Sequence, residues 1–361
     1  MQYSNKTLKI LYAVQATGNG HIARAMQLVP YLQEYGEVDV FLSGSNSNLD
    51  AALPVKYRSK GLSLFYGNRG GLDYIKMWKE LKLSRIWKEA NELPVDKYDL
   101  VINDFESITS LACKFKNVKS INFGHQASFI SDKTPKPAKR DFIGEWVLKN
   151  YAKASSYVGL HFEQYDDFIF SPIIKDNILK ATPTNEGHVA VYLSHYSDEV
   201  VVNSLNKCGD IPFQVFSKKV TSVEKRENVT LMPISNEGFN KSMVSAAGVI
   251  TGAGFETPAE ALYLGKKLLC LPIRGQYEQL CNAAALERFR VPIIDKIDEK
   301  FSFNIYQWLS GLRPKPLELA QSTQEIVDIV IEKGLSQNVS TQSKEEFFFM
   351  PHHHQDSLSL A

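Results

Sequence analysis

Short apolar runs alternate with segments of helical pattern, and this alternation occurs twice along the 361 residues. In the first half, the runs that we expect to form strands are residues 8–14, 37–44, 98–105 and 118–126. The second half starts the pattern again at residue 188 and ends it with a run over 266–273. Strands buried on both faces and joined by helices are typical of parallel sheets. The sequence therefore predicts an α/β fold with two Rossmann-like, doubly wound parallel sheets.

The two halves meet at a polar segment without periodicity, residues 178–188, which contains Pro183 and Gly187. We therefore expect an N-terminal domain over 1–180 and a C-terminal domain over 181–335. Two such domains face each other across a cleft, and ligands of open α/β sheets bind at the carboxyl ends of the strands.

The last segment, residues 336–361, differs from the rest because it is polar and shows no period. We expect a flexible tail. The alternative is a metal-binding tract, since His352, His353 and His354 are adjacent.

Composition limits the class of protein. Hydrophobic residues make up 44% of the chain, which suffices for two cores. The formal net charge of +1 argues neither for nucleic acid nor for an acidic partner, and we expect no nucleic acid as a partner. The four cysteines form no CxxC pair, which is typical of reduced core thiols in the cytoplasm. No apolar run resembles a leader peptide or reaches the roughly 20 residues of a spanning helix. We expect a cytoplasmic protein.

The most informative stretch follows the apolar run that ends at Thr251. The residues Gly252-Ala253-Gly254 allow the backbone to approach a ligand closely. A helix is expected to begin at about Thr257-Pro258, with proline suited to its first turn. Because the start of a helix presents free amide groups and partial positive charge, this stretch predicts an anion site, most simply for a diphosphate.

Polar residues of the next two helices favour a sugar nucleotide. Glu260 lies one turn into the first helix, where a carboxylate can accept hydrogen bonds from a ribose diol. Its alternative role is to stabilise the helix dipole. Glu278, Gln279 and Asn282 stand near the start of the second helix and suit a sugar with several hydroxyls. Their alternative role is helix capping and solvation.

Taken together, these residues resemble the C-terminal signature of GT-B fold glycosyltransferases. That group includes the plant UDP-glycosyltransferases and the bacterial N-acetylglucosamine transferase that completes the peptidoglycan lipid precursor. The signature stands here as Gly254, Glu260, Gly265, Pro272, Glu278, Gln279, Asn282 and Ala283. From about residue 8 to residue 334 the chain resembles, more closely, a family of bacterial and archaeal glycosyltransferase-like proteins. The resemblance implies a GT-B fold and a nucleotide-diphosphate sugar as donor, with UDP as the expected nucleotide.

The resemblance also implies roles for single residues on the donor side. The diphosphate would be faced by Gly252, Ala253, Gly254, Phe255, Glu256 and Thr257. Glu260 would face the ribose, Glu278 and Gln279 would face the donor sugar, and Ile234 would face the nucleobase. This chain departs from the plant pattern twice, because Gly252 replaces a histidine and Glu256 replaces an asparagine. A carboxylate at Glu256 repels a diphosphate unless it points away or is paired.

The first half is expected to bind the acceptor. In the stretch Thr-Gly-Asn-Gly-His, Gly18 and Gly20 permit a turn after the first strand, so that His21 projects into the cleft. Histidine titrates near neutral pH and can take the proton of an acceptor hydroxyl, and the resemblance implies this role. Asp104, at a later strand end, would orient His21.

Alternatives remain for each of these residues. His21 could cap or pack against its own helix, and Asp104 could cap the helix that follows it. In the bacterial transferase the equivalent loop also shapes the phosphate side, so Gly18, Gly20 and His21 could contact the donor instead.

Two further histidines end strands. His125 and Gln126 are expected to line the acceptor pocket, and the alternative for His125 is a buried structural role. His195, at the first strand end of the second half, is expected to contact the diphosphate and offset the histidine missing at Gly252.

These observations predict an inverting, metal-independent glycosyltransferase that uses no cofactor. No DxD motif ends a strand, and a single base without a paired nucleophile favours direct displacement. The acceptor would be a small molecule, a glycan or a lipid-linked hydroxyl. Two rival hypotheses are a non-hydrolysing UDP-sugar epimerase and a nucleotide-sugar-binding protein without turnover.

Basic segments with tryptophan, residues 75–90 and 132–155, raise the further prospect of peripheral contact at the inner membrane face. The alternative is an ordinary solvated helix face. The sequence leaves the oligomeric state open.

Overall fold

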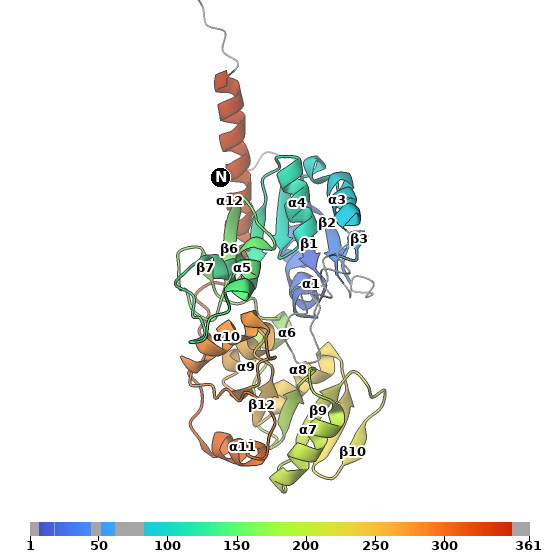
Figure 1. Ribbon diagram of the computed structural model, residues 1–361, viewed down its shortest axis with the longest axis vertical. Coiled ribbons are helices and arrows are strands. Elements are labelled where there is room, and N and C mark those ends of the chain that lie inside the picture. The colour runs from blue at the N-terminus through green and yellow to red at the C-terminus, as the bar shows by residue number, and fades with distance from the viewer. Residues whose placement is uncertain (1–6, 18, 45–51, 62–82, 349–361) are drawn as a thin grey trace, which may run out of the picture.

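The chain forms two α/β lobes, which lie one above the other in Figure 1. The computed structural model describes residues 7–17, 19–44, 52–61 and 83–348. Each lobe is built on one sheet of mainly parallel strands with helices beside it. The predicted α/β class with two doubly wound sheets is therefore confirmed.

The first lobe contains a seven-stranded, wholly parallel sheet in the order β3-β2-β1-β4-β5-β6-β7. Its strands are β1 (Leu8–Gln15), β2 (Gly36–Ser43), β3 (Val55–Ser59), β4 (Leu100–Asp104), β5 (Ile121–Gly124), β6 (Ser156–Leu160) and β7 (Ile169–Phe170). Its helices include α1 (Asn19–Gln33), α3 (Leu83–Glu92), α4 (Ser107–Phe115) and α5 (Phe142–Asn150), with a 3₁₀ segment η2 (His125–Ile130) after β5.

Strand β1 shows why a continuous apolar run was needed at the centre of this sheet. Tyr12 and Val14 pack in the cluster that contains α1, whereas Leu11 and Ala13 pack in the cluster that contains α3 and α4. Because successive side chains point to opposite faces, a strand covered on both faces is apolar at most of its positions.

The second lobe contains a six-stranded sheet in the order β10-β11-β9-β8-β12-β13, parallel except for β10. Its strands are β8 (Val189–Tyr192), β9 (Phe213–Ser217), β10 (Glu224–Arg226), β11 (Val229–Pro233), β12 (Gly248–Thr251) and β13 (Lys267–Cys270). Its helices are α7 (Asp198–Leu205), α8 (Asn236–Ser245), α9 (Glu256–Tyr263), α10 (Tyr277–Glu287) and α11 (Phe301–Ser310), and the short α6 (Asp176–Leu179) lies in the linker.

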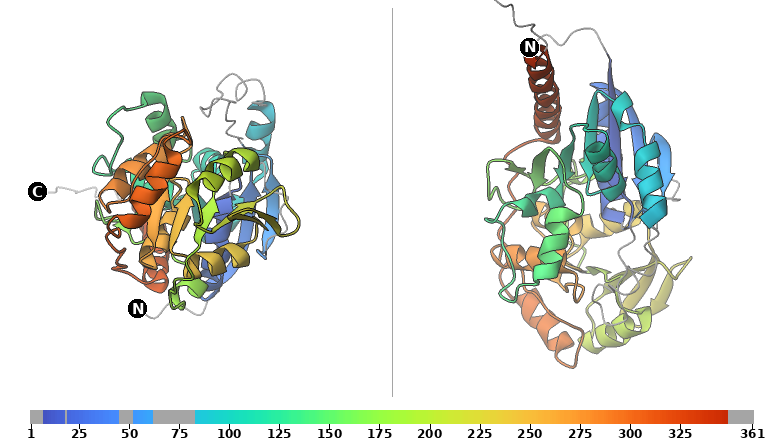
Figure 2. Two further views of the ribbon diagram at one scale, coloured as in Figure 1. Left: turned by 90° about the horizontal axis from the view of Figure 1, so that it is seen from below. Right: turned by 45° about the horizontal axis from the view of Figure 1, so that its top comes forward.

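The last helix, α12 (Thr323–Phe348), returns to the first lobe, where it contacts α1, β4 and β5. The right-hand view of Figure 2 shows it beside the strands of that lobe. Ile326, Val327, Val330 and Ile331 are buried, and this helical spacing explains the packing. The expected division at residue 335 is therefore wrong, since the segment belongs to the first lobe and the helix continues past 336. Residues 349–361, with the three adjacent histidines, lie outside the described residues.

Both sheets reverse their strand order beside their first strand. In the first lobe this switch lies between β1 and β4, and in the second between β8 and β12. The loops at the carboxyl ends of such strand pairs diverge and leave room for a ligand. Hence the turns after β1, β4, β8 and β12 are where a site is expected.

The described helices do not include one that combines the length and the apolar character needed to cross a bilayer. The four cysteines are all buried and none forms a disulfide.

Candidate active site

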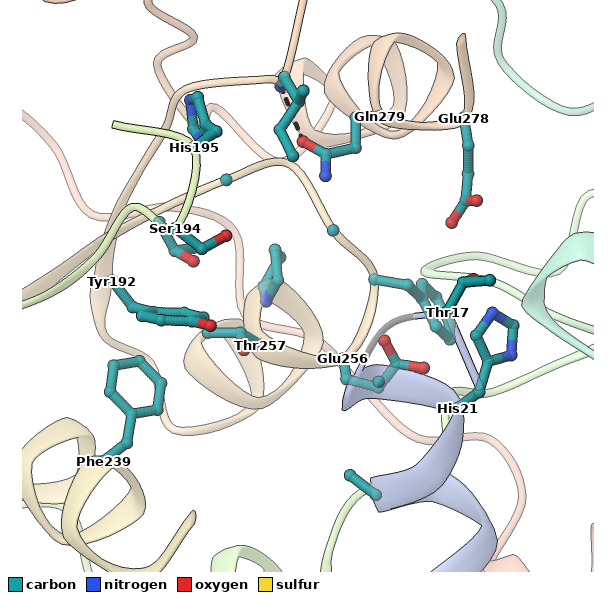
Figure 3. Close-up of a pocket in the computed structure, with 18 of the residues that line it drawn as sticks. Thr17, His21, Tyr192, Ser194, His195, Phe239, Glu256, Thr257, Glu278 and Gln279 are labelled. Carbon is teal, nitrogen blue, oxygen red and sulfur yellow. Dashed lines mark hydrogen bonds between the residues drawn. The ribbon is translucent and has the colours of Figure 1, made fainter. Parts of the chain in front are cut away.

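A cavity of about 600 Å³ is lined by residues of both lobes (Figure 3). Most of the residues expected at the site line it: Gly20, His21, Gln126, His195, Ile234, Gly252, Gly254, Phe255, Glu256, Thr257, Glu278 and Gln279. Gly18 lies outside the described residues.

His21 stands in the first turn of α1, and its Nδ1 lies 2.9 Å from Oδ1 of Asp104, the last residue of β4. Asp104 is fully buried behind the cavity wall. The helix after β4 is capped by Glu106, which accepts hydrogen bonds from the amides of Ile108 and Thr109. The alternative role of Asp104 as a helix cap is therefore excluded, and the predicted approach of Asp104 to His21 is present.

The turn after β4 places Asp104. Phe105 has a φ of 53°, a left-handed conformation that is unusual for a residue other than glycine. The Asn103 side chain holds this turn, because it donates to the carbonyl of Glu106 and accepts from the amide of the same residue, each at 2.7 Å. Such a sharp turn directs the carboxylate toward α1.

Arg24, which the sequence analysis did not single out, is the second partner of Asp104. Its Nη2 lies 2.7 Å from Oδ1 and its Nε 3.1 Å from Oδ2 of that carboxylate. Burial acts to raise the pKa of Asp104, but the charges of Arg24 and His21 and their hydrogen bonds lower it to about 2. The carboxylate is therefore ionised at neutral pH and accepts hydrogen bonds only.

This ionised carboxylate favours the tautomer of His21 with its proton on Nδ1, which leaves the lone pair on Nε2. The Nε2 atom of His21 lies 3.4 Å from Nε2 of the Gln126 side chain, which also lines the cavity. His21 thus presents a basic nitrogen to the space between the lobes.

The opposite wall contains the turn after β12 and the start of α9. An added Cβ at Gly254 would meet nothing within 4 Å, so the backbone here borders open space. Phe255 precedes α9, and no side chain in the described part of the chain caps the first amide groups of this helix. These amides remain free to bind an anion.

Glu256, the first residue of α9, forms an ion pair with Arg24 of the first lobe. The carboxylate is therefore compensated, which meets the condition stated for it from the sequence. In Figure 3 it points toward His21.

His125 and Asn282 do not line the cavity, and the predictions that placed them there are wrong. The His125 ring is fully buried, with Nδ1 2.9 Å from the carbonyl oxygen of Leu160 and Nε2 2.8 Å from Oδ1 of Asn282. Burial lowers the pKa of His125. Asn282 in turn donates to the carbonyl of Ala253, which is fully buried as well and does not line the cavity. These contacts join the lobes.

Glu260 does not line the cavity either. It is 1% exposed and its Oε1 lies 3.0 Å from Nζ of Lys175. Burial raises its pKa, an effect that Lys175 partly offsets. Lys175 does line the cavity, so at this position the structure presents an ammonium group where we expected a carboxylate.

His195 lines the cavity on the side away from His21 (Figure 3). Its Nε2 is buried and has no hydrogen-bond partner among the described residues. Burial lowers the pKa of His195 to about 4, so the ring is neutral at pH 7. A neutral imidazole can still donate one hydrogen bond to a ligand.

The remaining walls differ in chemistry. Tyr192 and Phe239, whose ring centroids are 5.9 Å apart, lie at the end away from His21. Gln279 accepts a hydrogen bond from the Ile273 amide at 2.9 Å, while Glu278 lies on the same helix nearer His21. Within the described ranges, no three His, Cys, Asp or Glu side chains are grouped as a metal site requires.

A model of the family described as glycosyl transferase family 1 matches residues 8–310. No curated protein matches. Among solved structures, Arabidopsis thaliana UGT89C1 is 14% identical, with a TM-score of 0.59, and 91% of this chain covers 100% of that one. Acinetobacter baumannii MurG is 15% identical, with a TM-score of 0.55 and coverages of 91% and 100%.

A third similar structure is the spinosyn forosaminyltransferase SpnP, at 14% identity and a TM-score of 0.56, with coverages of 92% and 100%. At these identities the likeness to the three structures concerns the GT-B fold. The family match spans most of the chain and agrees with the resemblance found in the sequence. The chain belongs to glycosyl transferase family 1 and is a glycosyltransferase of the GT-B fold.

Proposed function

We propose that this glycosyltransferase moves a sugar from a nucleotide-diphosphate donor, with UDP as the expected nucleotide, to a hydroxyl acceptor, with inversion and without a metal. The observation that carries the proposal is the pair of His21 and Asp104 in one lobe, opposite the uncapped start of α9 in the other.

In the proposed reaction, Nε2 of His21 takes the proton of the acceptor hydroxyl. The acceptor oxygen forms a bond to the anomeric carbon as the bond from that carbon to the diphosphate oxygen breaks. The electron pair of the broken bond leaves with the nucleoside diphosphate, and Asp104 stabilises the imidazolium. A single displacement inverts the anomeric configuration.

The leaving diphosphate is proposed to lie at the start of α9. Free amide groups and the partial positive charge of the helix would stabilise its developing charge in place of a cation. His195 and Lys175 line the same cavity and are suited to donate to phosphate oxygens. Glu278 and Gln279 would bind the donor sugar.

The nucleobase is proposed to bind at the end of the cavity formed by Tyr192, Phe239 and Ile234. Aromatic rings there offer a stacking surface. Structures of Arabidopsis thaliana UGT89C1 with UDP, with UDP-L-rhamnose and with quercetin support a nucleotide sugar and a small-molecule acceptor for this fold.

A screen of nucleotide sugars by thermal shift tests the donor. A ligand at 100 times its dissociation constant stabilises the fold by about 2.7 kcal/mol. Release of nucleoside diphosphate with an acceptor then establishes transfer, and release of an epimerised sugar nucleotide would identify the epimerase hypothesis. If a donor binds and neither reaction occurs, the chain is a binding protein and the proposal is wrong.

The first lobe is further proposed to rest on an anionic lipid surface through α5. Three apolar residues of this helix are exposed to solvent: Phe142 is 76% exposed, Ile143 56% and Trp146 65%. Their spacing places them on one face, and the exposed Lys139 and Lys153 flank the helix. Figure 1 shows α5 beside α10, which it contacts at the border between the lobes.

Part of the positive charge expected in this segment is compensated within it. Lys136 and Arg140 pair with Glu145, and Lys149 pairs with Asp132. The apolar face therefore contributes most to the proposed contact, which would bring the cavity to lipid-linked acceptors. Residues 75–82 of the other basic segment lie outside the described residues.

A further inference from the structure

Arg24 links the base to the donor lobe. Its guanidinium holds Asp104 through Nε and Nη2, pairs with Glu256 of α9 through Nη1, and places Nη2 3.0 Å from Nδ1 of His21. One side chain therefore contacts three elements, α1, β4 and α9, and two lobes.

The close approach of Glu256 is built into the first turn of α1. A Cβ added to Gly20 would lie 2.7 Å from Oε2 of Glu256, so this carboxylate reaches Arg24 beside a residue without a side chain. Arg24 is 4% exposed, and a buried cation needs compensating charge. The single negative charge of Asp104 is enough to compensate Arg24, and Glu256 adds a second negative charge.

The charges of this cluster balance only after proton transfer. Asp104, Arg24 and Glu256 sum to −1 while His21 is neutral, and to zero once His21 has taken a proton. Without Glu256, the cluster would be neutral before the reaction and positive after it. Glu256 thus favours the protonated form of His21 from the other lobe, whereas Arg24 opposes it.

We propose that Glu256, acting through Arg24, is a positioning residue that makes the proton affinity of His21 depend on contact between the lobes. This inference rests on the proposed function, in which His21 is the base. It assigns to Glu256 a role in the acceptor chemistry, although the residue stands at the start of the helix proposed to bind the donor.

The other groups that face this cluster do not change the sign of the effect. Tyr12 of β1 lies behind Asp104, and burial together with the Asp104 charge holds its pKa well above the ordinary value, so the phenol is neutral. Gln126 of η2 is uncharged, and Glu278 of α10 is common to all variants.

The test is an NMR titration of the His21 ring in the full chain without donor or acceptor, with His21→Gln used for assignment. Glu256→Gln is expected to lower the titration midpoint of His21 by about 0.5–1 pH unit, and Arg24→Gln to raise it by about 1 pH unit. The matched control is Glu163→Gln, because Glu163 pairs across the lobes with Arg288 at 3.0 Å and is not in contact with His21.

We expect the His21 titration midpoint to shift in opposite directions in Glu256→Gln and Arg24→Gln. A loss of stability alone would shift the midpoint in the same direction in both variants, or in neither. Equal midpoints in Glu256→Gln and Glu163→Gln would overturn the proposal. If Arg24→Gln does not fold, Arg24→Lys is used. It keeps the cation but cannot span both carboxylates, so Glu256→Gln should lose its effect in that background. An undiminished effect there would also overturn it.

This measurement is independent of turnover. Full transfer by His21→Ala would refute the proposed base and leave the titration result intact. Loss of transfer in His21→Ala with unchanged midpoints in the other variants would refute the inference alone.

Discussion

His125 of the first lobe stacks on Phe255 of the second, with ring centroids 3.9 Å apart and planes 6° from parallel. Phe255 is the residue before α9, so the stack fixes the start of that helix against the first lobe. Asn282 adds a hydrogen bond to the same ring. This buried contact holds the two walls of the cavity in register and explains how Glu256, the next residue, reaches Arg24.

Replacement of His21 by alanine is expected to reduce transfer by about 10²–10⁴-fold while donor binding persists, because only the proton acceptor is lost. Steady-state turnover and donor calorimetry measure the two properties separately. His195→Ala serves as a control histidine, for which weaker donor binding is expected instead. Unchanged turnover in His21→Ala would mean that another group takes the proton.

Asp104→Asn is expected to remove a pH-dependent contribution to stability. The pKa of Asp104 in the folded chain is about 2, against an ordinary value of 3.8. The contribution is therefore fully present above pH 3.8 and is lost as the pH falls through 2, and it amounts to about 2 kcal/mol. Urea unfolding of wild type and variant should show a difference that shrinks over this range. The exposed Asp167→Asn is the control substitution.

Much of the fold could be predicted because parallel strands buried on both faces are apolar over most of their length. The runs that became β1, β4 and β12 are of this kind, and the helix start after Gly254 was predicted within two residues. Strands β3, β6, β7 and β10 were missed because they are short and lie at or near sheet edges. The packing of α12 on the first lobe could not be predicted, since helical periodicity marks a buried face and not its partner.

The site residues that could be predicted are those that the topology of the strands brings together. Asp104 ends β4, and His21 follows β1. Because β1 and β4 are adjacent in the sheet, the topology brings the two residues together. Arg24 follows His21 by three residues on one helix face, and this spacing was the available signal. The burial of His125 and Asn282 depends on partners in the other lobe, which a local pattern does not contain.

Gly254→Ala is expected to leave stability unchanged and to weaken donor binding. The added methyl group would meet no atom within 4 Å in the unliganded chain, but it would occupy the space proposed for the diphosphate. A steric cost of about 1–3 kcal/mol corresponds to roughly 5–150-fold in the dissociation constant. Thermal unfolding and calorimetry measure the two effects. An unaltered affinity would place the donor elsewhere in the cavity.

Donor binding is expected to tighten as the pH falls from 7 to 5. The pKa of His195 is about 4 in the free protein, owing to burial, and a diphosphate beside the ring would raise it. Binding would then take up protons, and lower pH favours proton uptake. Calorimetry in buffers of different ionisation enthalpy measures the number of protons. In His195→Asn this uptake should vanish, and if it persists, another group is responsible.

The exposed face of α5 is expected to bind anionic vesicles. Because Phe142 and Trp146 would insert at the headgroup boundary, the double variant Phe142→Ser/Trp146→Ser should lower the partition coefficient by about tenfold or more on phosphatidylglycerol vesicles. Cosedimentation measures the partition coefficient. The same measurement on phosphatidylcholine vesicles separates the electrostatic contribution to binding. Phe303→Ser is the matched control, since Phe303 is 58% exposed on α11 of the other lobe. Equal losses in both variants would show that exposed aromatic groups act without regard to position, and the lipid contact of α5 would be refuted.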